Sequence, residues 1–502
     1  MSLNKSEFDS YTAQGYTRIP LVREVLADLD TPLSTYIKLA GDEYSYLFES
    51  VSGSEKASRY SIIGLSARQI FRATGDLVEI LEDGGIVKSF TSSDPLQAVR
   101  EYQQSFKAPD IDGLPRFTGG LVGYFSYDTI RYIEPGLGEN QHPDPLQTPD
   151  VLLMVSDEIL IFDKLKGRLF IVINVDPREA GVWDSGQQRI DEIAQLLDQP
   201  LSHQSNAVTS EVAENDFHSG FSREGYMQAV DRAREYIRAG DIMQVVLSQR
   251  MSIPYEAQPL DLYRALRTLN PSPYMYFMNL GDFQVVGSSP EILVQVDSGK
   301  ATVRPIAGTR PRGKNEVEDV ALEQDLMADP KELAEHLMLV DLGRNDLGRI
   351  AEIGSVELTD RMVIERYSHV MHIVSNVVCD IRKEFDAIDV LRATFPAGTV
   401  SGAPKIRAME IIDELEPVKR GVYSGAVGYL GWNGNMDTAI AIRTSVIKEG
   451  MLNIQVGAGI VADSQPEMEW EETLNKGRAT FRAVAMAASG FRQLSEGGMI
   501  CF

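Results

Sequence analysis

The sequence predicts an α+β protein, and three observations support this fold class. Early in the chain, Ile159–Phe162 and Leu169–Val175 have the apolar composition of strands and flank a Lys-Gly turn, which indicates a hairpin. A helical pattern begins at Ser222, a good cap, and ends at Gly240, where helices commonly stop. Met243–Leu247 then has the composition of a strand, and helices alternate with strands from there onwards. The first 200 residues are therefore mainly β, and the rest is α+β.

Other segments of the first half add strands to this prediction. Glu43–Phe48 and Leu121–Phe125 have strand composition, whereas residues 1–20 show no strong periodicity. The segments Gly120–Tyr124 and Gly425–Tyr429 are similar, but five residues are too few to establish a repeat. We therefore interpret this similarity as chance.

Length and composition place the chain among large globular proteins. Its 502 residues exceed what one simple core supports, and 43% of them are hydrophobic. Residues 198–216 form a polar segment with a proline and several serines, which makes it the best candidate for a boundary. We expect an N-terminal part of residues 1–200 and a C-terminal part of residues 217–490.

The charge and the cysteine content restrict the partners and the compartment. A formal net charge of −25 argues against nucleic acid and anionic membranes as partners. The sequence shows no signal peptide and no apolar run of membrane-spanning length, and it has only two cysteines, Cys379 and Cys501. We expect a cytoplasmic protein without disulfides, in which an anionic substrate would need a metal ion or a local group of arginines and lysines.

One predicted helix near the C-terminus carries two carboxylates and an ammonium on one face. Residues Ser464 to Glu467 supply the helix start, with a Ser cap, Pro in the first turn and Glu three residues after the cap. Glu469, Glu472 and Lys476 follow at i, i+3 and i+7, so they share a face.

A second acidic pair, Glu332 and Glu335, lies on one face of another predicted helix, which begins at Asp329. Four carboxylates without a nearby set of Cys or His suit Mg²⁺, so the two acidic faces could meet over one ion. The alternative is that each pair lies on a solvated helix face. The apolar residues expected on the opposite face of the second helix are Leu333, Leu337 and Val340.

Two features upstream of the C-terminal helix suit a bound anion. The strand-like segment Gln455–Ile460 contains Gly457 and Gly459, whose small size leaves backbone N–H groups accessible. Arg443 lies in the apolar run Ala439–Thr444, where its guanidinium needs a partner, and a carboxylate suits that group best.

Four long segments of the second half resemble the chorismate-utilising enzymes, and they occur in the order found in that family. The resemblance is strong over residues 220–485 and looser before them. It implies antiparallel β-sheets packed against each other and surrounded by helices, and it is greatest to the branch of the family that forms anthranilate. The segments are Pro305–Gly313, Lys331–His336, Asp341–Asp346 and Phe395–Lys405.

The resemblance implies a magnesium site and a substrate pocket. Glu335 and Glu472 would be the main Mg²⁺ ligands, with Glu332 and Glu469 completing the acidic shell partly through water. The metal would hold the ring carboxylate of chorismate. The residues implied for the rest of the substrate are Tyr423, Arg443, Gly457, Ala458 and Gly459 at the enolpyruvyl carboxylate, Gly308 and Thr309 at the ring, and Lys476 as added positive charge.

The expected reaction replaces the C4 hydroxyl of chorismate by an amino group at C2 and then eliminates pyruvate. Glu291 matches the general acid of the family, with a simple turn glutamate after Pro290 as the alternative. His372 matches a histidine near the departing groups, which we assign to proton handling, although a lone histidine is more often a core residue. Thr399 would donate a positioning hydrogen bond, with a turn threonine as the alternative.

Two positions indicate that ammonia is the nucleophile and anthranilate the product. Relatives that use water carry Lys where this chain has Gln244, and Gln cannot deprotonate water. Aminodeoxychorismate synthases commonly carry Lys in place of Ala307, so that activity is disfavoured. Neither Cys379 nor Cys501 has the setting of a glutaminase nucleophile, so the resemblance implies a separate glutamine amidotransferase subunit, expected in a heterotetramer.

The N-terminal part resembles the feedback element of the family. Leu47–Ser50 and Asn270–Met275 match its two walls, between which tryptophan would bind as an inhibitor; the alternative is that they hold core aromatic residues and a strand-end charge. Two further alternatives remain for the whole chain: a 2-amino-2-deoxyisochorismate synthase, which stops before pyruvate loss, and a tryptophan-binding regulatory relic. The tryptophan contacts expected are Glu49, Ser50, Pro273, Tyr274 and Met275, with Arg59 as a further candidate.

Overall fold

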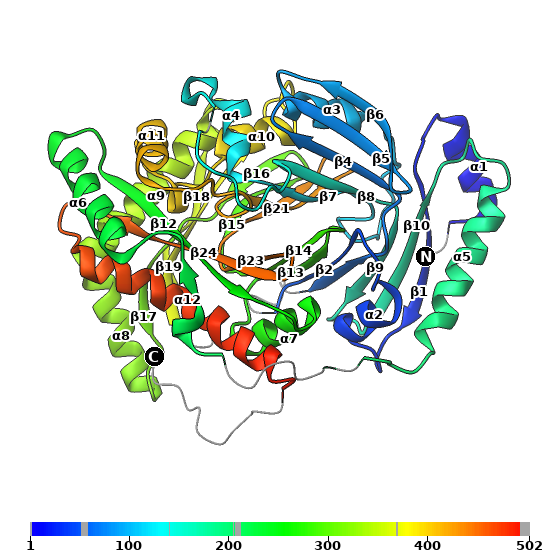
Figure 1. Ribbon diagram of the computed structural model, residues 1–502. Coiled ribbons are helices and arrows are strands. Elements are labelled where there is room, and N and C mark those ends of the chain that lie inside the picture. The colour runs from blue at the N-terminus through cyan, green and yellow to red at the C-terminus, as the bar shows by residue number, and fades with distance from the viewer. Residues whose placement is uncertain are drawn as a thin grey trace.

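The computed structural model describes residues 3–51, 59–139, 141–203, 205, 212–367 and 370–491. It confirms an α+β fold built on two large antiparallel sheets, with helices around them (Figure 1). No helix within these ranges is long and apolar enough to cross a membrane.

The first sheet contains strands from both ends of the chain. In spatial order these are β1 (Ile19–Leu26), β10 (Arg168–Val175), β9 (Glu158–Asp163), β3 (Tyr60–Gly64), β2 (Ser45–Glu49), β13 (Tyr274–Asn279), β14 (Phe283–Ser289), β23 (Thr444–Lys448), β24 (Met451–Ile460), β12 (Gln244–Pro254) and β11 (His218–Ser219), with β20 (Gly402–Ala403) paired to β12.

The second sheet is equally mixed in sequence. Its spatial order is β17 (Ile306–Pro311), β19 (Val370–Asp380), β16 (Lys300–Val303), β15 (Ile292–Asp297), β22 (Met436–Ile440), β21 (Ala426–Gly431), β7 (Gly120–Phe125), β8 (Val151–Ser156), β4 (Gln69–Thr74), β5 (Leu77–Glu82) and β6 (Gly85–Thr91), with β18 (Glu357–Arg366) paired to β19.

The helices lie on the outside of this pair of sheets. They are α1 (Lys5–Ala13), α2 (Pro32–Leu39), α3 (Pro95–Gln104), α4 (Ile130–Ile133), α5 (Val182–Leu197), α6 (Arg223–Ala239), α7 (Pro259–Leu269), α8 (Glu316–Ala328), α9 (Pro330–Gly348), α10 (Ala387–Thr394), α11 (Lys405–Leu415) and α12 (Pro466–Ala488).

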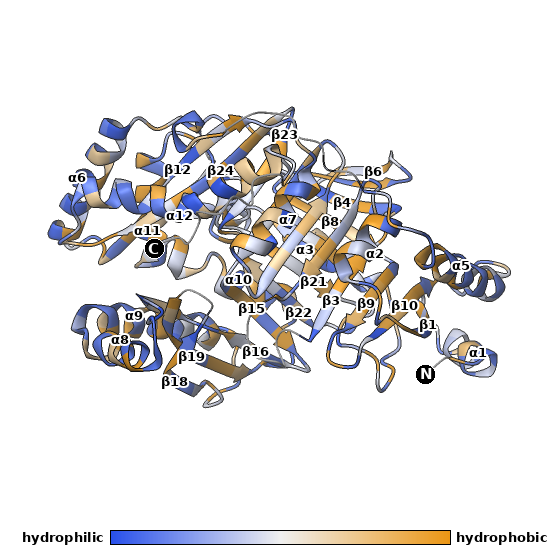
Figure 2. Ribbon diagram, turned by 90° about the horizontal axis from the view of Figure 1, so that it is seen from below, coloured by the Kyte–Doolittle hydropathy of each residue, from blue (hydrophilic) through white to orange (hydrophobic). Residues whose placement is uncertain are grey.

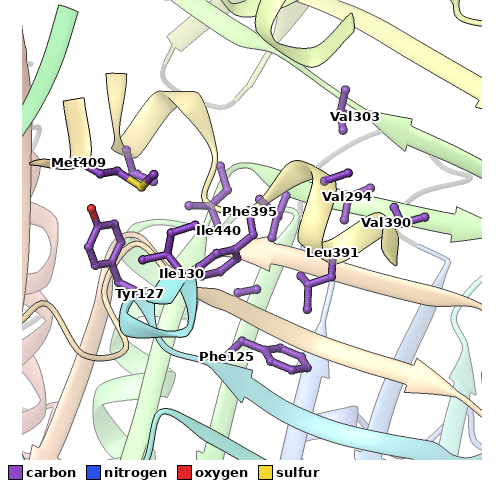
Figure 3. Close-up of a cluster of buried hydrophobic side chains, with 14 of the residues drawn as sticks. Phe125, Tyr127, Ile130, Val294, Val303, Val390, Leu391, Phe395, Met409 and Ile440 are labelled. Atoms are coloured by element: carbon purple, nitrogen blue, oxygen red, sulfur yellow. The ribbon is translucent and has the colours of Figure 1, made fainter. Parts of the chain in front are cut away.

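Apolar side chains hold the sheets together and attach the helices. Between the sheets, Tyr46 and Tyr276 of the first sheet pack in one cluster with Val122 of the second. On the other face of the first sheet, residues of α2, α5, α7 and α12 form a second cluster. Residues of α3 and α10 pack on the second sheet, where Phe125 and Leu391 lie in one group (Figure 3). The expected sandwich of sheets with surrounding helices is thus observed.

The strand order of both sheets contains an internal repeat. The two halves of the chain meet where β2 pairs with β13 and where β7 pairs with β21. Outwards from these seams, β2-β3-β9-β10-β1 is matched by β13-β14-β23-β24-β12, and β7-β8-β4-β5-β6 is matched by β21-β22-β15-β16-β19. Helices α1, α2, α3 and α5 occupy the same places in chain order as α6, α7, α10 and α12. Each half is therefore one copy of a common arrangement.

The five-residue similarity seen in the sequence belongs to this repeat, so its interpretation as chance is wrong. Gly123 on β7 lies directly opposite Gly428 on β21. A Cβ on Gly123 would lie 1.9 Å from Leu152 O of β8, and a Cβ on Gly428 would lie 2.0 Å from Asp437 O of β22. Because β8 and β22 are equivalent strands, the same close backbone approach requires glycine in both halves.

The strands of residues 1–200 and of residues 217–490 occupy opposite ends of both sheets. Both sheets nevertheless run without a break across the two parts, through the seams β2/β13 and β7/β21. The division into two separate domains remains a prediction. Several residues of the proposed boundary, 204 and 206–211, lie outside the described ranges.

Several local predictions are confirmed and three need correction. The hairpin of β9 and β10 and the helix α6, capped by Ser222 and ended by Gly240, are as expected. Gln465, not Ser464, occupies the N-cap position of α12; the Ser464 hydroxyl instead accepts a hydrogen bond from Val461 N–H at 3.0 Å. Leu337 is 46% exposed, so it does not belong to the buried face of α9. Arg443 lies between β22 and β23 and not within a strand.

Candidate active site

The candidate site forms where the chain of the second half crosses between the sheets twice. Glu291 lies at the crossing from β14 to β15, and Arg443 lies at the crossing from β22 to β23. Ile440 N–H donates to Glu291 O at 3.0 Å, and Ser288 N–H donates to Arg443 O at 3.1 Å. These backbone bonds fix the two crossings side by side, although the residues are far apart in sequence.

The backbone of Arg443 differs from the sequence prediction. The apolar run around it is not a continuous strand, because β22 ends at Ile440 and β23 begins at Thr444. Arg443 itself has φ +49°, a left-handed conformation that is uncommon for residues other than glycine. The run Ala439–Thr444 is apolar because the crossing is buried, and burial alone does not distinguish a crossing from a strand.

Glu291 has an environment that favours the protonated carboxyl group. Burial raises the pKa of Glu291 to about 7, against smaller lowering effects of a hydrogen bond from Thr399 and of the charges of Arg443 and Lys476. The charge of Glu335 raises it further. A carboxyl group in this state can donate a proton near neutral pH, which is what a general acid requires.

The Arg443 guanidinium interacts electrostatically with this carboxyl group but forms no ion pair with it in the described chain. Burial lowers the pKa of Arg443, and the charge of Glu291 opposes that shift. Within the described residues, the Arg443 side chain makes no hydrogen bond and no ion pair. A partly buried guanidinium without a partner suits an incoming carboxylate.

His372 lies on β19 beside a bulge of β17. The register of these strands shifts between Ala307 and Thr309, and Gly308, with φ +68°, is the residue at the shift. His372 Nδ1 lies 3.0 Å from Gly308 O and 3.1 Å from Thr309 Oγ1. Because a carbonyl oxygen only accepts, Nδ1 carries the proton and Nε2 keeps its lone pair. Burial lowers the pKa of His372, so the ring is neutral at pH 7.

One edge of β24 is open next to these groups. β23 pairs with β24 only as far as Ile454, whereas β12 pairs with it up to Ile460. Backbone groups of Gly457, Ala458 and Gly459 that point away from β12 therefore have no strand partner in the described chain. Lys476 Nζ donates to Gly457 O on this edge at 3.0 Å.

Gln244 and Tyr423 approach the glycines of this edge from one face of the sheet. A Cβ on Gly457 would lie 2.8 Å from the Tyr423 hydroxyl oxygen, and one on Gly459 would lie 2.7 Å from Gln244 Nε2. Gln244 is 6% exposed, and its Oε1 has no hydrogen-bond partner within the described residues. A buried amide oxygen without a donor is costly, so a donor group of a ligand would stabilise it.

The two acidic faces lie on the helices α9 and α12. In Figure 2, α9 lies beside α8, and α12 lies beside β24. Burial raises the pKa of Glu335, and the charges of Glu332 and Glu472 raise it further. Burial also raises the pKa of Glu469, and the charge of Glu472 adds to the effect. The acidic groups of the two helices therefore interact electrostatically across this part of the molecule.

The donor set suits Mg²⁺ by its chemistry but is not a closed cage. Within the described ranges, no three acidic, His or Cys side chains lie close enough together to hold a metal ion. Lys476 Nζ lies 2.8 Å from Glu472 Oε1, and Arg310 Nη1 lies 3.5 Å from Glu332 Oε1. Mg²⁺ commonly binds through one or two carboxylates together with water and substrate oxygens, so paired faces of this kind fit it.

The predicted tryptophan walls lie next to each other at the seam of the first sheet. Met275 of β13 is directly opposite Glu49 of β2, and Val51 N–H donates to Ser272 O. The Glu49 carboxylate is buried and accepts from the Tyr263 hydroxyl at 2.6 Å. Arg267 Nε also donates to it at 2.9 Å, so the charge of Glu49 already has a partner.

The other residues of this region have mixed surroundings. Ser50 and Pro273 are partly buried, and the Tyr274 hydroxyl donates to Asp437 Oδ1 at 3.0 Å. Arg59, the further candidate, donates from Nε to Asp163 at 3.0 Å. Residues 52–58, which follow the first wall, lie outside the described ranges, as does Cys501.

Sequence reasoning missed a group of three residues beside His372. The Tyr367 hydroxyl donates to Glu365 Oε2 at 3.0 Å, and Arg304 also bonds to Glu365. The Tyr367 ring lies edge-on to the His372 ring, with centroids 5.6 Å apart, and Arg304 lines a cavity together with Glu291. The sequence signal for this group was the position of Arg304, directly before the family segment Pro305–Gly313.

Comparison with known proteins identifies the family of the chain. Residues 47–482 match the family model described as chorismate binding enzyme. The chain is 60% identical to anthranilate synthase component 1 of Pseudomonas putida over 487 residues, which cover 97% of this chain and 99% of that protein. It is 47% identical to the protein of the same name from Aquifex aeolicus (strain VF5), again over 97% and 99% of the two chains. The crystal structure of anthranilate synthase component I from Streptococcus pneumoniae TIGR4 superimposes with a TM-score of 0.77 at 38% identity, covering 91% of this chain and 99% of that one. The resemblance found in the sequence is confirmed, and the chain belongs to the chorismate binding enzyme family.

Proposed function

We propose that this protein is the synthase component of an anthranilate synthase, which converts chorismate and ammonia into anthranilate, pyruvate and water. The observation that carries the proposal is the pairing of Glu291 and Arg443 on neighbouring crossings. One supplies a carboxyl group that is still partly protonated at pH 7, and the other supplies an unpaired guanidinium. Relatives named anthranilate synthase component 1 at 47–60% identity support this particular chemistry.

In this proposal the second half of the chain binds the two carboxylates of chorismate at separate places. Arg443, the Tyr423 hydroxyl and the open edge at Gly457 to Gly459 hold the enolpyruvyl carboxylate. The Lys476 ammonium adds positive charge beside that edge. Gly308 and Thr309 line the ring, where the left-handed glycine lets the backbone approach closely.

The order of proton transfers follows from the protonation states of the two titratable groups. Ammonia attacks C2 while the C4 hydroxyl leaves as water, taking the proton of Glu291, and Thr399 holds that carboxyl group by a hydrogen bond. Neutral His372 presents Nε2 for the proton lost when pyruvate is eliminated and the ring becomes aromatic. Gln244 Oε1, which lacks a donor in the described chain, accepts a hydrogen bond from the incoming ammonia.

Magnesium is part of the proposal. Glu335 and Glu472 would hold it, with Glu332 and Glu469 acting partly through water. The bound ion would neutralise the ring carboxylate of the substrate. Burial raises the pKa of Glu335 and Glu469, repulsion between the carboxylates adds to the effect, and binding of a cation would relieve that repulsion.

Ammonia and regulation complete the proposal. Ammonia would come from a separate glutamine amidotransferase subunit in a heterotetramer, in agreement with the numbering of the relatives as component 1. Tryptophan would bind as an inhibitor at the seam between β2 and β13, near Glu49, Ser50 and the segment Pro273 to Met275. The neighbouring strand positions of the two walls support this location.

The direct test is product formation by the isolated chain. Chorismate, Mg²⁺ and an ammonium salt are added to the purified protein, and the fluorescence of anthranilate is followed between pH 7 and 8.5. A fluorescent aromatic product with one pyruvate per turnover is expected. A non-aromatic amine without pyruvate would show an aminodeoxyisochorismate synthase instead, and unchanged chorismate would favour a regulatory relic. Lys300→Met, which removes an exposed ion pair with Asp380 away from these groups, serves as the control variant and should match the wild type.

A further inference from the structure

One stripe of α9 connects a proposed metal ligand with a partly buried ion pair. Glu335, Leu339, Leu342 and Asp346 follow each other at spacings of four, three and four residues, so they lie on the same face of the helix. Leu339, Leu342 and Asp346 line the cavity that also borders Glu291. The stripe thus begins at Glu335, on the acidic face of α9, and continues along the wall of the cavity that Glu291 also lines.

The loop that carries Thr399 is attached to this stripe at two points. At the first, Gly398 packs so closely on α9 that a Cβ would lie 2.7 Å from Leu342 Cδ1. At the second, Lys405 Nζ donates to Asp346 Oδ2 at 2.8 Å and to Thr394 O at 3.4 Å. The side chains of Lys405 and Asp346 are only 14% and 16% exposed.

Thr399 lies between these two points of attachment, in the short 3₁₀ turn Gly398–Val400. Its hydroxyl makes the hydrogen bond to the Glu291 side chain. Both residues border the same cavity. On its other side the loop is held by β12, where Val246 N–H donates to Ser401 O at 2.9 Å, and by Arg420, which donates to Val400 O at 2.6 Å. The attachments to α9 hold the side of the loop that faces the cavity with Glu291.

We propose that Asp346 and Lys405 are positioning residues for the proton donor: their ion pair holds the Thr399 loop against α9, and Thr399 holds Glu291. The same helix then fixes the distance between Glu291 and Glu335. This inference rests on the proposed function, in which Glu291 donates the proton. An ion pair that served stability alone would have no need to lie on the stripe that carries Glu335, and buried pairs are often replaceable without loss of stability.

The first test compares turnover in four variants. Lys405→Met should lower kcat about tenfold or more and leave KM for chorismate nearly unchanged, because Arg443 and the β24 edge are not touched. Thr399→Val should have the same effect, and the double variant should be no worse than either single one. Lys405→Arg, which keeps the charge, should restore most of the turnover. Additive losses, or a lowered melting temperature with normal kcat in Lys405→Met, would overturn the proposal.

The second test measures Glu291 itself and does not depend on turnover. The Thr399 hydrogen bond lowers the pKa of Glu291, so its loss should raise that pKa in Thr399→Val and in Lys405→Met alike, as read from ¹³C-labelled glutamate by NMR. The other charged groups that act on Glu291 are Arg443, Lys476 and Glu335, and they stay in place in both variants. Lys300→Met is the matched control, because its exposed ion pair lies away from the loop.

These measurements separate failure of the inference from failure of the proposed function. A wild-type chain that makes no aromatic product would refute the function, while the NMR titration would still show whether Lys405 controls Glu291. An unchanged Glu291 titration in Lys405→Met, together with a changed one in Thr399→Val, would refute the positioning role alone.

Discussion

Each half of the molecule crosses twice between the sheets, and the residues at these crossings differ between the halves. In the first half, β3 passes to β4 through Leu65, which is buried and apolar, and β8 passes to β9 through Asp157. Asp157 has a partner, because Arg18 Nε donates to it at 3.0 Å. The equivalent crossings of the second half hold Glu291 and Arg443, whose guanidinium has no partner in the described chain.

The second half also contains two insertions that the first half lacks. Between β16 and β19 it adds β17, α8, α9 and β18, and between α10 and β21 it adds β20 and α11. The first insertion carries Gly308, Thr309 and the acidic face of α9, and the second is preceded by Thr399. The repeat therefore supplies a common scaffold, whose strands β12 and β24 and helix α12 carry Gln244, Gly457 and Glu472. The crossings and the added segments of the second half supply the other candidate residues.

The largest expected effect is the loss of the proton donor. Glu291→Gln should lower kcat by about a thousandfold, within the range for removal of a general acid. In the other half, Ser66→Ala at the equivalent crossing should leave kcat unchanged, because the Ser66 hydroxyl only bonds to Glu43 O at the surface. Steady-state kinetics with chorismate measures both. Equal losses in the two variants would remove the functional difference between the halves.

Protein stability provides a check on the Glu291→Gln variant. The pKa of Glu291 in the folded protein, about 7, is above its ordinary value of 4.5. The carboxyl group therefore contributes stability that is present below pH 4.5 and is lost as the pH rises through 7. At pH 8, Glu291→Gln should unfold at a temperature no lower than the wild type, which shows that lost activity is not lost fold.

The next effect concerns the seam, where the two halves should respond alike. Gly123→Ala and Gly428→Ala each place a methyl group about 2 Å from a backbone oxygen, and each should cost about 3 kcal/mol of unfolding free energy. Urea denaturation measures both variants. A loss in only one of them would mean that the packing of the two halves is not equivalent.

A smaller effect is expected for substrate binding. Arg443→Met removes a charged hydrogen-bond donor and should raise KM for chorismate about 10- to 100-fold, corresponding to about 1.5–3 kcal/mol. Arg68→Met in the first half removes an exposed arginine that pairs with Asp83, and KM should not change. A normal KM in Arg443→Met would move the second carboxylate of the substrate elsewhere.

The pH dependence follows from the direction of the shift at Glu291. Because only the protonated acid is active, kcat/KM should fall about tenfold for each pH unit above about 7. Burial lowers the pKa of His372, so that ring should stay neutral and active down to below pH 6.5. A profile of kcat/KM between pH 5.5 and pH 9 measures both the expected decrease above pH 7 and the activity retained at low pH. A flat profile above pH 7 would exclude Glu291 as the group that limits the rate.

The smallest effect on catalysis is expected from the first half. Ser50→Phe changes the seam wall next to Glu49 and should weaken inhibition by tryptophan, while kcat without tryptophan should stay close to that of the wild type. Inhibition curves with increasing tryptophan measure this. Unaltered inhibition would place the effector away from the seam, and the halves would not divide into an effector part and a catalytic part.

The sequence predicted local structure correctly where a residue type has one structural role. Ser222 and Gly240 bounded α6 correctly because caps are local, and the apolar composition of Leu169–Val175 was enough for β10. The location of Glu291 and Arg443 at sheet crossings could not be predicted, because it depends on which sheet each neighbouring strand joins. The predicted burial of Leu337 was wrong for a similar reason. Helical spacing predicts which residues share a face, but the elements that pack against the helix decide which face is buried.

The repeat shows the same limit more clearly. The glycines Gly123 and Gly428 are alike in the two halves because a neighbouring backbone comes too close there for any side chain. Elsewhere many sequences satisfy the same strand order. The candidate metal ligands were recognised from family segments, and their spacing alone did not separate them from solvated glutamates.

The seams also have a consequence for synthesis of the chain. The strands β2 and β7 leave the ribosome long before β13 and β21, which are their neighbours in the finished sheets. Until those partners emerge, each sheet of the nascent first half ends in unpaired amide and carbonyl groups that can recruit strands of other chains. Translation of the second half is therefore the period in which this protein is most exposed to aggregation, and completion of β21 closes the last of these edges.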